Sequence, residues 1–365
     1  MIPISKPSIG EEEMKAVESV LRSGMLASGP NVKCFEEAVA RYVGTKHGVA
    51  TSSGTTALQV AVEALGIGPG DEVITTPFTF IATSNAILFR GAKPVFADID
   101  PKTFNIDPKS VKAKITDRTK AILPVHLYGN PCDMDSITRI CAKHKLLLLE
   151  DCAQSIGAEW KGRKTGSFGG AAIFSFYATK NLSTGEGGMV LTNSDDVREK
   201  AFLLANQGQK VRYEHQSIGF NYRMNEIEAA IGMCQLFKLD DMNKKRIENA
   251  KFFSEQLAGL DFIELPAVPK NAKHVFHQYT LRVLGGKSDR LAEHLERRFG
   301  VMARIYYPKV SYLQPAYSNL GIKAGACPEA EKAAAEVLSI PVYPSLTQTE
   351  LEWIVKAIKS FGVKP

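Results

Sequence analysis

The chain has 365 residues, 44% of them hydrophobic and 23% charged, which predicts a folded protein with two domains, or one large domain with a smaller appendage, and excludes a disordered chain. Its formal net charge is +6, but the basic residues are scattered among acidic ones, and the densest basic run, Lys244–Arg246, is followed by Glu248. We therefore expect no nucleic-acid-binding surface, because that would need a basic stripe along one face.

The first two-thirds of the chain alternates helix-like and strand-like segments. The N-terminal segment Met1–Pro7 is too polar for a signal peptide, and the glutamates at 11–13 begin a surface helix. Helices are also predicted at Ala57–Leu65 and Asp135–His144. The predicted strands are Val73–Thr76, Pro94–Ala97, Ala121–Val125, Leu146–Leu149, Ala171–Phe176 and Met189–Thr192. This alternation predicts a mostly parallel sheet that is covered by helices on both faces.

A long helical pattern begins near Met224 and continues toward Leu257. We place a domain boundary within it, so that residues 1–240 form a large α/β domain and residues 241–365 a small α+β domain. The small domain is expected to contain strands at Gln278–Val283 and Val301–Tyr306 and a final helix at Thr349–Phe361. The six cysteines form no Cys-x-x-Cys pair, and no apolar run approaches the roughly 20 residues of a membrane helix, which predicts a reduced, cytoplasmic protein without a metal site.

Small and hydroxyl residues gather at the start of the predicted helix 57–65. Ser52–Leu58 reads Ser-Ser-Gly-Thr-Thr-Ala-Leu. Such a helix start offers free backbone N–H groups to an anion such as phosphate, although simple capping by serine or threonine is an alternative. The segment lacks the glycine and lysine pattern of a P-loop, so nucleotide hydrolysis is not expected.

Two ionisable side chains follow predicted strands. Asp151 comes after the leucine-rich strand 146–149, where a buried carboxylate needs a cation or strong donor, unless it merely caps a turn. Lys180 lies between strand 171–176 and the glycine-rich loop Ser183–Gly188; it is a candidate Schiff-base lysine, or else an exposed loop lysine. Together with the anion-binding helix start, these residues are the parts of a pyridoxal-phosphate site, in which the lysine carries the aldehyde and the aspartate keeps the pyridine nitrogen protonated.

Further segments extend this pattern along nearly the whole chain. They are Phe35-Glu36, Ser53-Gly54-Thr55, Gly68–Val73, Pro77–Phe80, Asp98–Asp100, Glu150–Gln154, Thr179–Leu182, Gly185–Gly188 and Gly219–Met224. In this order they resemble the DegT/DnrJ/EryC1/StrS family of sugar aminotransferases, within the aspartate aminotransferase superfamily. The resemblance implies a fold-type I pyridoxal-phosphate enzyme, with a large domain around a mostly parallel sheet and a smaller C-terminal α+β domain.

The resemblance also implies roles for residues around the cofactor. Lys180 would be the Schiff-base lysine and general base, and Asp151 would pair with the pyridine nitrogen. Gln154 would lie near the ring hydroxyl, and Phe80, rather than Phe78, would stack on the ring. The phosphate would be held by the backbone of Gly54, Thr55 and Thr56, by Ser175 and by Asn221 of a neighbouring subunit. A homodimer with shared active sites is therefore implied, although Asn221 could instead cap the following helix.

The substrate side of the site is implied by the same resemblance. Glu186, Tyr306 and Tyr307 would lie near a nucleotide sugar, beside Pro308. Glutamate would donate the amino group, and the sequence of the loop Ser183–Gly188 favours a 4-keto sugar over a 3-keto sugar as the acceptor. Some relatives have histidine at the position of Lys180 and act as dehydratases, so the lysine favours transamination. Two alternatives stay open: an aminotransferase for cyclic ketones in aminocyclitol assembly, and a cofactor-binding regulator without turnover.

Overall fold

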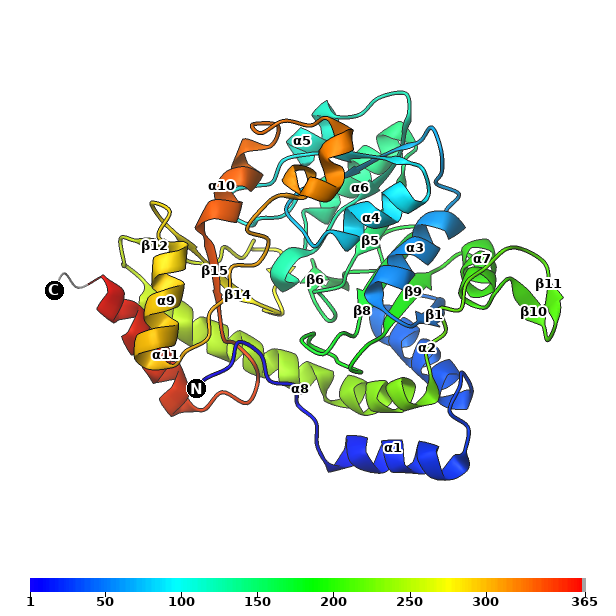
Figure 1. The fold of residues 1–365 in the computed structure, drawn as a ribbon, viewed down its shortest axis with the longest axis horizontal. Helices are drawn as coiled ribbons and strands as arrows, with labels where there is room; N and C mark the ends of the chain where they lie inside the picture. The colour runs from blue at the N-terminus through cyan, green and yellow to red at the C-terminus, as the bar shows by residue number, and fades with distance from the viewer. Residues whose placement is uncertain (363–365) are drawn as a thin grey trace.

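The computed structural model describes residues 1–362 and contains a seven-stranded sheet of order β1-β9-β8-β5-β4-β2-β3 (Figure 1). Strands β3, β2, β4, β5 and β8 run parallel, whereas β9 is antiparallel to both of its neighbours. These strands are β1 (His47–Thr51), β2 (Glu72–Thr75), β3 (Lys93–Phe96), β4 (Thr119–Leu123), β5 (Leu147–Asp151), β8 (Ala171–Ser175) and β9 (Gly188–Thr192). The six strands predicted in the first two-thirds of the chain all end within two residues of observed ones, and the expected α/β fold is confirmed.

Helices cover both faces of this sheet, because successive strand residues point to opposite faces and both sets are apolar. Val73 and Ile173 pack in one hydrophobic cluster with α3, α4 and α7, while Ile74 packs with α5 and α6 on the opposite face. Phe174, next to Ile173, packs on that opposite face with α2 and α8. The helices are α1 (Glu11–Ser23), α2 (Pro30–Val43), α3 (Gly54–Ala64), α4 (Ala82–Phe89), α5 (Pro108–Ala113), α6 (Met134–His144), α7 (Asp195–Ala205) and α8 (Glu226–Leu257).

The C-terminal part forms a small antiparallel sheet of order β12-β14-β15. Its elements are β12 (Ile263–Glu264), β14 (Tyr279–Val283), α9 (Ser288–Phe299), α10 (Pro328–Glu336), β15 (Val337–Ile340) and α11 (Gln348–Phe361). The predicted strand at Gln278–Val283 and the predicted final helix are confirmed as β14 and α11. The predicted strand Val301–Tyr306 is wrong: Val301 and Arg304 make only isolated bridges, to Ile2 and Ser339. The chain cannot extend this pairing because it turns at Tyr307, which has a φ of 62°.

The long helix α8 connects the two parts. Its first half packs with α2 and the large sheet, and its second half, including Phe253, packs into the core of the small sheet together with Ile2. Val310 and Ala333, by contrast, belong to the hydrophobic cluster of the large sheet, although they lie late in the sequence. A division into residues 1–240 and 241–365 therefore stays a proposal, supported by the change of packing partner along α8.

The remaining elements are short. They are β6 (Glu159–Trp160), β7 (Arg163–Lys164) and β13 (Ala272–Lys273) in one small sheet, the hairpin of β10 (Gln209–Val211) and β11 (Glu214–His215), and the 3-10 helices η1 (Leu127–Gly129), η2 (Ser311–Leu313) and η3 (Pro315–Leu320). The β10–β11 hairpin projects from the large domain at the right of Figure 1. Within residues 1–362, no helix is both long enough and apolar enough to cross a membrane.

Candidate active site

A cavity of about 500 Å³ lies at the edge of the sheet where the parallel strands end. Ligands of open α/β sheets bind at this edge, because the loops that follow the strands can place side chains there without disturbing the core. Every site residue predicted from the sequence lies in its wall, except Thr56 and Asn221. The predicted residues in the wall are Gly54, Thr55, Phe80, Asp151, Gln154, Ser175, Lys180, Glu186, Tyr306 and Tyr307.

Lys180 stands in a tight turn just after β8, with its backbone N–H donating to the carbonyl of Tyr177 at 2.8 Å. Its side chain is half-buried in the cavity wall. Loss of hydration lowers the pKa of Lys180 to about 8, and the negative charge of Asp151 partly opposes this change. A large fraction of this amine is therefore neutral near pH 8, and the neutral amine is the form that acts as nucleophile or base.

Asp151 is the last residue of β5 and is 3% exposed. Its Oδ2 accepts a hydrogen bond from Thr83 Oγ1 at 2.9 Å, and its Oδ1 accepts one from the backbone N–H of Ala153 at 3.1 Å. Burial raises the pKa of Asp151, and these two hydrogen bonds, with the charge of Lys180, only partly offset that rise. A protonated ring nitrogen would supply the cationic donor that this buried carboxylate lacks among residues 1–362.

The start of α3 forms one end of the cavity. Ser53 caps the helix: its Oγ accepts from the backbone N–H of Thr56 at 3.1 Å, so that N–H is already in use and Thr56 lies outside the cavity wall. No hydrogen-bond acceptor within the described chain faces the backbone N–H groups of Gly54 and Thr55. The serine cap and an anion-binding helix start, which the sequence left as alternatives, are therefore compatible, because capping uses one N–H and leaves two for an anion.

Gly54 allows this helix start to lie against β8. A Cβ at Gly54 would stand 3.3 Å from Ser175 Cα and 2.7 Å from Ser175 Cβ, and the second distance is closer than real side chains approach. We expect Gly54→Ala to weaken cofactor binding roughly tenfold or more, because overpacking of this kind costs about 1–3 kcal/mol and would move the N–H groups away from the phosphate. Equilibrium dialysis with pyridoxal phosphate measures the change.

Gly170→Ala is the matched control for this prediction. A Cβ at Gly170 would meet Leu65 Cδ2 at 3.7 Å, which is ordinary van der Waals contact, so cofactor binding should stay unchanged. Equal affinity in the two variants would show that the close approach of Gly54 to Ser175 has no part in phosphate binding.

Gln154 makes hydrogen bonds to two segments that flank the site, at Tyr128 and at Tyr307. Its Oε1 accepts from the backbone N–H of Tyr128 at 2.7 Å, and its Nε2 donates to Tyr307 Oη at 2.8 Å. Phe80 is 59% exposed and faces the cavity, whereas Phe78 is fully buried and packs edge-on against Tyr128 and Tyr307. Of these two phenylalanines, Phe80 is therefore the one that is free to stack on a ring in the cavity.

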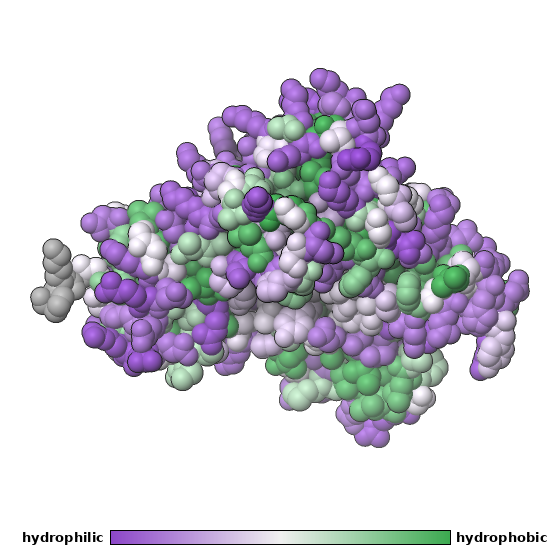
Figure 2. All heavy atoms as spheres, turned by 45° about the horizontal axis from the view of Figure 1, so that its top comes forward, coloured by the Kyte–Doolittle hydropathy of each residue, from purple (hydrophilic) through white to green (hydrophobic). Residues whose placement is uncertain are grey.

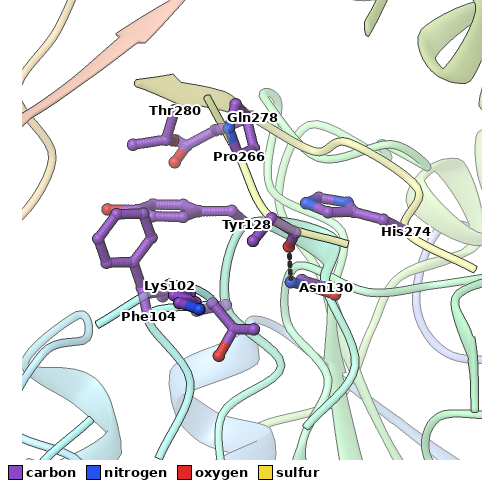
Figure 3. A pocket seen from close by; sticks show the side chains of 11 residues that line it. Lys102, Phe104, Tyr128, Asn130, Pro266, His274, Gln278 and Thr280 are labelled. Atoms are coloured by element: carbon purple, nitrogen blue, oxygen red, sulfur yellow. Dashed lines mark hydrogen bonds between the residues drawn. The ribbon is translucent and has the colours of Figure 1, made fainter. Parts of the chain in front are cut away.

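A second cavity, beside Tyr128 and Gln278, is only about 10 Å³ in volume (Figure 3). Gln278 also lines the main cavity, so the two spaces are neighbours. Tyr128 Oη, Asn130 Oδ1 and Gln278 Oε1 are buried and have no hydrogen-bond partner among the described residues. A polar space of this size accommodates one water and no substrate, so we assign the chemistry to the larger cavity alone.

Behind Asp151, on the opposite face of β5, lie the buried side chains of His126, Glu150 and Cys152. The two carboxylate oxygens of Glu150 accept from the backbone N–H groups of Gly166, Phe168 and Gly169 and lie 3.2 Å from His126 Nε2 at the nearest point. His126 Nδ1 accepts from the N–H of Cys132, so its proton is on Nε2. These contacts fully occupy Glu150, which gives the group a structural role under β5.

The sequence did not identify several residues of the cavity wall, among them Thr83 and His277. Thr83 lies in the first turn of α4, three residues after Phe80, and its nearness in sequence to Phe80 was the signal available for it. His277 comes just before β14, far from the other site residues in the sequence, and no local pattern pointed to it. Burial and the positive charges of Lys180 and Arg246 hold the pKa of His277 well below its usual value, so this histidine is neutral.

Asn221 lies outside the cavity of its own chain and is exposed. The alternative that it caps the following helix is excluded, because α8 begins at Glu226 and its cap is Asn225, whose side chain accepts from the N–H of Glu228 at 2.9 Å. Its neighbours Phe220 and Tyr222 stack on each other with ring centroids 4.7 Å apart. The side chain of Asn221 is thus available to a second molecule.

Comparison with known proteins places the chain among aminotransferases. The model of the DegT/DnrJ/EryC1/StrS aminotransferase family matches residues 7–359. The pleiotropic regulatory protein of Geobacillus stearothermophilus is 44% identical, over 96% of this chain and 94% of that protein. GDP-perosamine synthase of Caulobacter vibrioides is 39% identical (98% and 97%), and UDP-N-acetyl-3-dehydro-alpha-D-glucosamine 3-aminotransferase of Acidithiobacillus ferrooxidans is 40% identical (96% and 93%).

Solved structures show the same similarity. DesV of S. venezuelae, solved in complex with a ketimine intermediate, has a TM-score of 0.94 and 38% identity, over 97% of this chain and 95% of that one. NtdA of Bacillus subtilis, solved with the bound cofactor PMP, has a TM-score of 0.90 and 34% identity, over 97% of this chain and 83% of that one. The similarity therefore extends over both the large and the small sheet.

Proposed function

Because the chain belongs to the DegT/DnrJ/EryC1/StrS aminotransferase family, we propose that it transfers an amino group from glutamate to a nucleotide-linked keto sugar, with pyridoxal phosphate as its cofactor. The observation that carries this proposal is the convergence of Lys180, Asp151 and the start of α3 on one cavity of about 500 Å³. A space of this size lies within the usual range of cofactor and ligand sites.

The residues present fit the cofactor. When bound, pyridoxal phosphate supplies an electron-accepting ring that makes the proton on the donor's α-carbon acidic and carries the amino group between two substrates. The N–H groups of Gly54 and Thr55 would hold the phosphate, and the carboxylate of Asp151 would keep the ring nitrogen protonated. Phe80 would cover one face of the ring, and Gln154, fixed by Tyr128 and Tyr307, would meet the ring hydroxyl.

Lys180 would be the general base. With a pKa of about 8, its amine can both accept and release a proton near neutral pH, which is the condition for efficient proton transfer. Its amine would take the proton from the α-carbon of glutamate in the first half-reaction. In the second half-reaction it would return a proton at the corresponding carbon of the sugar.

The sugar would bind on the side of the cavity that Glu186, Tyr306 and Tyr307 line. Relatives named as GDP-perosamine synthase and UDP-N-acetyl-3-dehydro-alpha-D-glucosamine 3-aminotransferase support a nucleotide-linked acceptor. The loop Ser183–Gly188 favours a 4-keto sugar, while the second of these names makes a 3-keto sugar the alternative to be tested. A cyclic ketone acceptor would lack the nucleotide altogether.

A panel of acceptors tests this function. The cofactor is first converted to its amine form with glutamate, and the protein is then mixed with 4-keto and 3-keto nucleotide sugars and with a cyclic ketone such as a keto-inositol. The true acceptor should restore the aldehyde absorbance. It should also raise the melting temperature, because a ligand at a hundredfold excess over its dissociation constant adds about 2.7 kcal/mol to the free energy of unfolding. If glutamate leaves the cofactor absorbance unchanged, glutamate is not the donor; a cofactor-binding regulator would leave it unchanged with every amino acid tested.

We also propose a homodimer in which Asn221 of one subunit reaches the phosphate in the other. Exposed apolar side chains support an interface along α1, where Met14 is 54% exposed, and on α8, where Phe237 is 92% exposed. Figure 2 shows a hydrophobic area at the lower edge of the molecule, in the place where α1 lies in Figure 1. Apolar surface of this kind commonly marks a protein–protein contact.

Mixed dimers test the shared site. Lys180→Ala and Asn221→Ala each damage both sites of their own dimer, but a hybrid dimer has one intact site and one doubly damaged site if Asn221 acts across the interface. Mixing the two variants should therefore restore some activity, up to about half of the wild-type activity per hybrid dimer. The control is Lys180→Ala mixed with Asp151→Asn, both within one subunit's site, which should restore none. A monomer in sedimentation, or no recovery after proven subunit exchange, contradicts the proposal.

A further inference from the structure

Three buried polar side chains from distant segments form a hydrogen-bonded chain that ends at the main cavity. They are Asn243 on α8, Asn181 next to Lys180 in the sequence, and His277 before β14, and each is at most 6% exposed except Asn243 and Asn181, which are 2% and 5% exposed. Asn243 Oδ1 accepts from Asn181 Nδ2 at 2.7 Å, and Asn181 Oδ1 lies 3.3 Å from His277 Nδ1. His277 and Lys180 both lie in the wall of the main cavity.

This chain of hydrogen bonds fixes the position of the proton on the His277 ring. The carbonyl of Ile156 can only accept, so it receives Asn243 Nδ2, at 3.0 Å, and Asn243 Oδ1 must face Asn181. Asn181 therefore directs its Nδ2 to Asn243 and to the carbonyl of Val275, at 3.1 Å, and its Oδ1 to His277. Only a donor can pair with that oxygen, so His277 Nδ1 carries the proton and Nε2 has a free lone pair.

Two cations lie near this lone pair. Burial holds the pKa of His277 well below its usual value, and the positive charges of Lys180 and Arg246 lower it further, so the ring is a neutral acceptor. Arg246 contacts the backbone carbonyl of His277, at 3.4 Å, rather than the ring, and its Nε has no partner among the described residues. Lys180 is therefore the cation that is left to donate to Nε2, and its long side chain lies in the same cavity wall.

The backbone before His277 is strained. Phe276 has a φ of 44°, in the left-handed region that residues with a side chain rarely adopt. Its N–H donates to His274 Nδ1 at 2.8 Å, and the two rings stack with their centroids 3.9 Å apart. Strained backbone of this kind is concentrated at functional sites, where the surrounding contacts hold it in place. This supports a role for His277 beyond filling the core.

We propose that His277 is a positioning residue for Lys180: its Nε2 accepts a hydrogen bond from the ammonium group that Lys180 carries after it takes the α-proton of the amino donor. The proton stays on Lys180, since Nε2 only accepts the bond, until the lysine returns it. A long lysine side chain has many rotamers, and holding the reacting group in one of them is a large contribution to the rate. This inference rests on the proposed function, because it assigns a second residue to the proton transfer at that site.

Two variants separate the two ring nitrogens of His277. The side-chain amide of glutamine can place its oxygen where Nε2 lies, whereas the shorter asparagine replaces Nδ1 with its amide nitrogen and puts nothing at Nε2. His277→Gln therefore keeps the acceptor that the proposal requires, and His277→Asn keeps only the hydrogen bond to Asn181. If His277 merely supports Asn181, His277→Asn should be the less damaging of the two variants.

The glutamate half-reaction is measured with ordinary and with α-deuterated glutamate, followed by cofactor absorbance. His277→Asn should lower the rate at saturating glutamate roughly 10- to 100-fold, as for the loss of a hydrogen bond to a charged group. It should also increase the deuterium isotope effect, because proton transfer becomes the slowest step, and leave half-saturation unchanged. His277→Gln should recover most of this loss. Equal losses in the two variants, the reverse order, a change in half-saturation alone, or no loss overturns the proposal.

Labelling of Lys180 in the apo-protein tests the proposal without cofactor or donor. Reductive methylation with formaldehyde and dimethylamine borane at pH 7, followed by peptide mass mapping, reports how much of the amine is neutral. With a pKa of about 8, about a tenth of Lys180 is neutral at this pH. An acceptor favours the ammonium form, so its loss in His277→Asn should speed labelling by up to about tenfold, whereas His277→Gln should label as the wild type does.

The labelling experiment has two internal controls. The exposed Lys15 on α1 should be methylated at the same rate in all three proteins. The other titratable groups that line the cavity or the small space beside His277 are also unchanged in them: Asp151, Tyr177, Glu186, Arg246, Tyr306 and Tyr307. An unchanged rate for Lys180 in His277→Asn contradicts the proposal.

Melting temperatures show whether each variant folds. If His277→Asn does not fold, His277→Ala takes its place, and free imidazole should restore its half-reaction; failure to restore it overturns the proposal. If the wild type takes an amino group from no donor, the proposed function fails, and the labelling of Lys180 still decides the present inference. If the wild type uses glutamate but neither the isotope effect nor the labelling depends on residue 277, only the present inference fails.

Discussion

Lys180→Ala is expected to abolish transamination while the protein stays folded and binds pyridoxal phosphate without a covalent bond. The substitution removes the amine that faces Asp151 across the cavity, but the phosphate site at Gly54 and Thr55 and the wall at Phe80 are unchanged. Losing both the covalent link and the general base should lower the rate at least about a thousandfold. The glutamate half-reaction, followed by cofactor absorbance, measures the loss.

The covalent link itself can be mapped and titrated. After borohydride reduction of the wild type, peptide mass mapping should find the pyridoxyl label on Lys180, and a label on any other lysine would falsify the assignment. Because burial lowers the pKa of Lys180 to about 8 and only the neutral amine attacks the aldehyde, cofactor capture by apo-protein should quicken as the pH rises through 8 and then level off. An ordinary lysine would show no plateau until about pH 10.4.

Asp151→Asn is expected to lower the glutamate half-reaction by orders of magnitude without unfolding the protein. An amide cannot keep the ring nitrogen protonated, so the ring would lose much of its ability to accept electrons. The amide oxygen can still accept from Thr83 Oγ1 or from the N–H of Ala153, as the carboxylate does at 2.9 and 3.1 Å.

Stability provides the control for this variant. Because burial raises the pKa of Asp151, its ionised form is less favourable in the folded apo-protein than in the unfolded chain, and this penalty is largest above the folded pKa. Asp151→Asn removes the penalty, so its apo-form should melt at the same temperature as the wild type or higher near neutral pH. A half-reaction close to the wild-type rate would reduce Asp151 to the capping residue that the sequence left open.

Much of the fold and of the candidate site could be predicted from the residue types of short segments. Six of the seven strands of the large sheet, all but β1, were located because each is a short apolar run, and the helix start at Ser53 was located because its residues are suited to capping. Asp151 and Lys180 were identified because each follows a buried strand, and strand ends meet at one edge of a parallel sheet. The assignment of Phe80 over Phe78 to the cavity agrees with their exposure, 59% against full burial.

Other features depended on contacts between distant parts of the chain. The strand predicted at Val301–Tyr306 failed because Tyr307 turns the chain into the cavity, while β15, which was not predicted, pairs with β14 instead. Arg246 reads in the sequence as part of a basic, solvated run, since Lys244 and Lys245 precede it. Only the packing of α8 against the segment before β14 buries it.

The sequence by itself therefore determined the α/β class, the edge of the sheet that carries the cavity, and most of the polar and aromatic residues that were expected there and line it. These follow from hydrophobic periodicity and from residue types at strand ends, which are properties of short segments. The tertiary structure alone decided that His277 and Arg246 lie beside Lys180, and that Thr56 and Asn221 do not face the cavity of their own chain. Burial and the direction of a side chain depend on which distant segments pack together, and no short stretch of sequence specifies that.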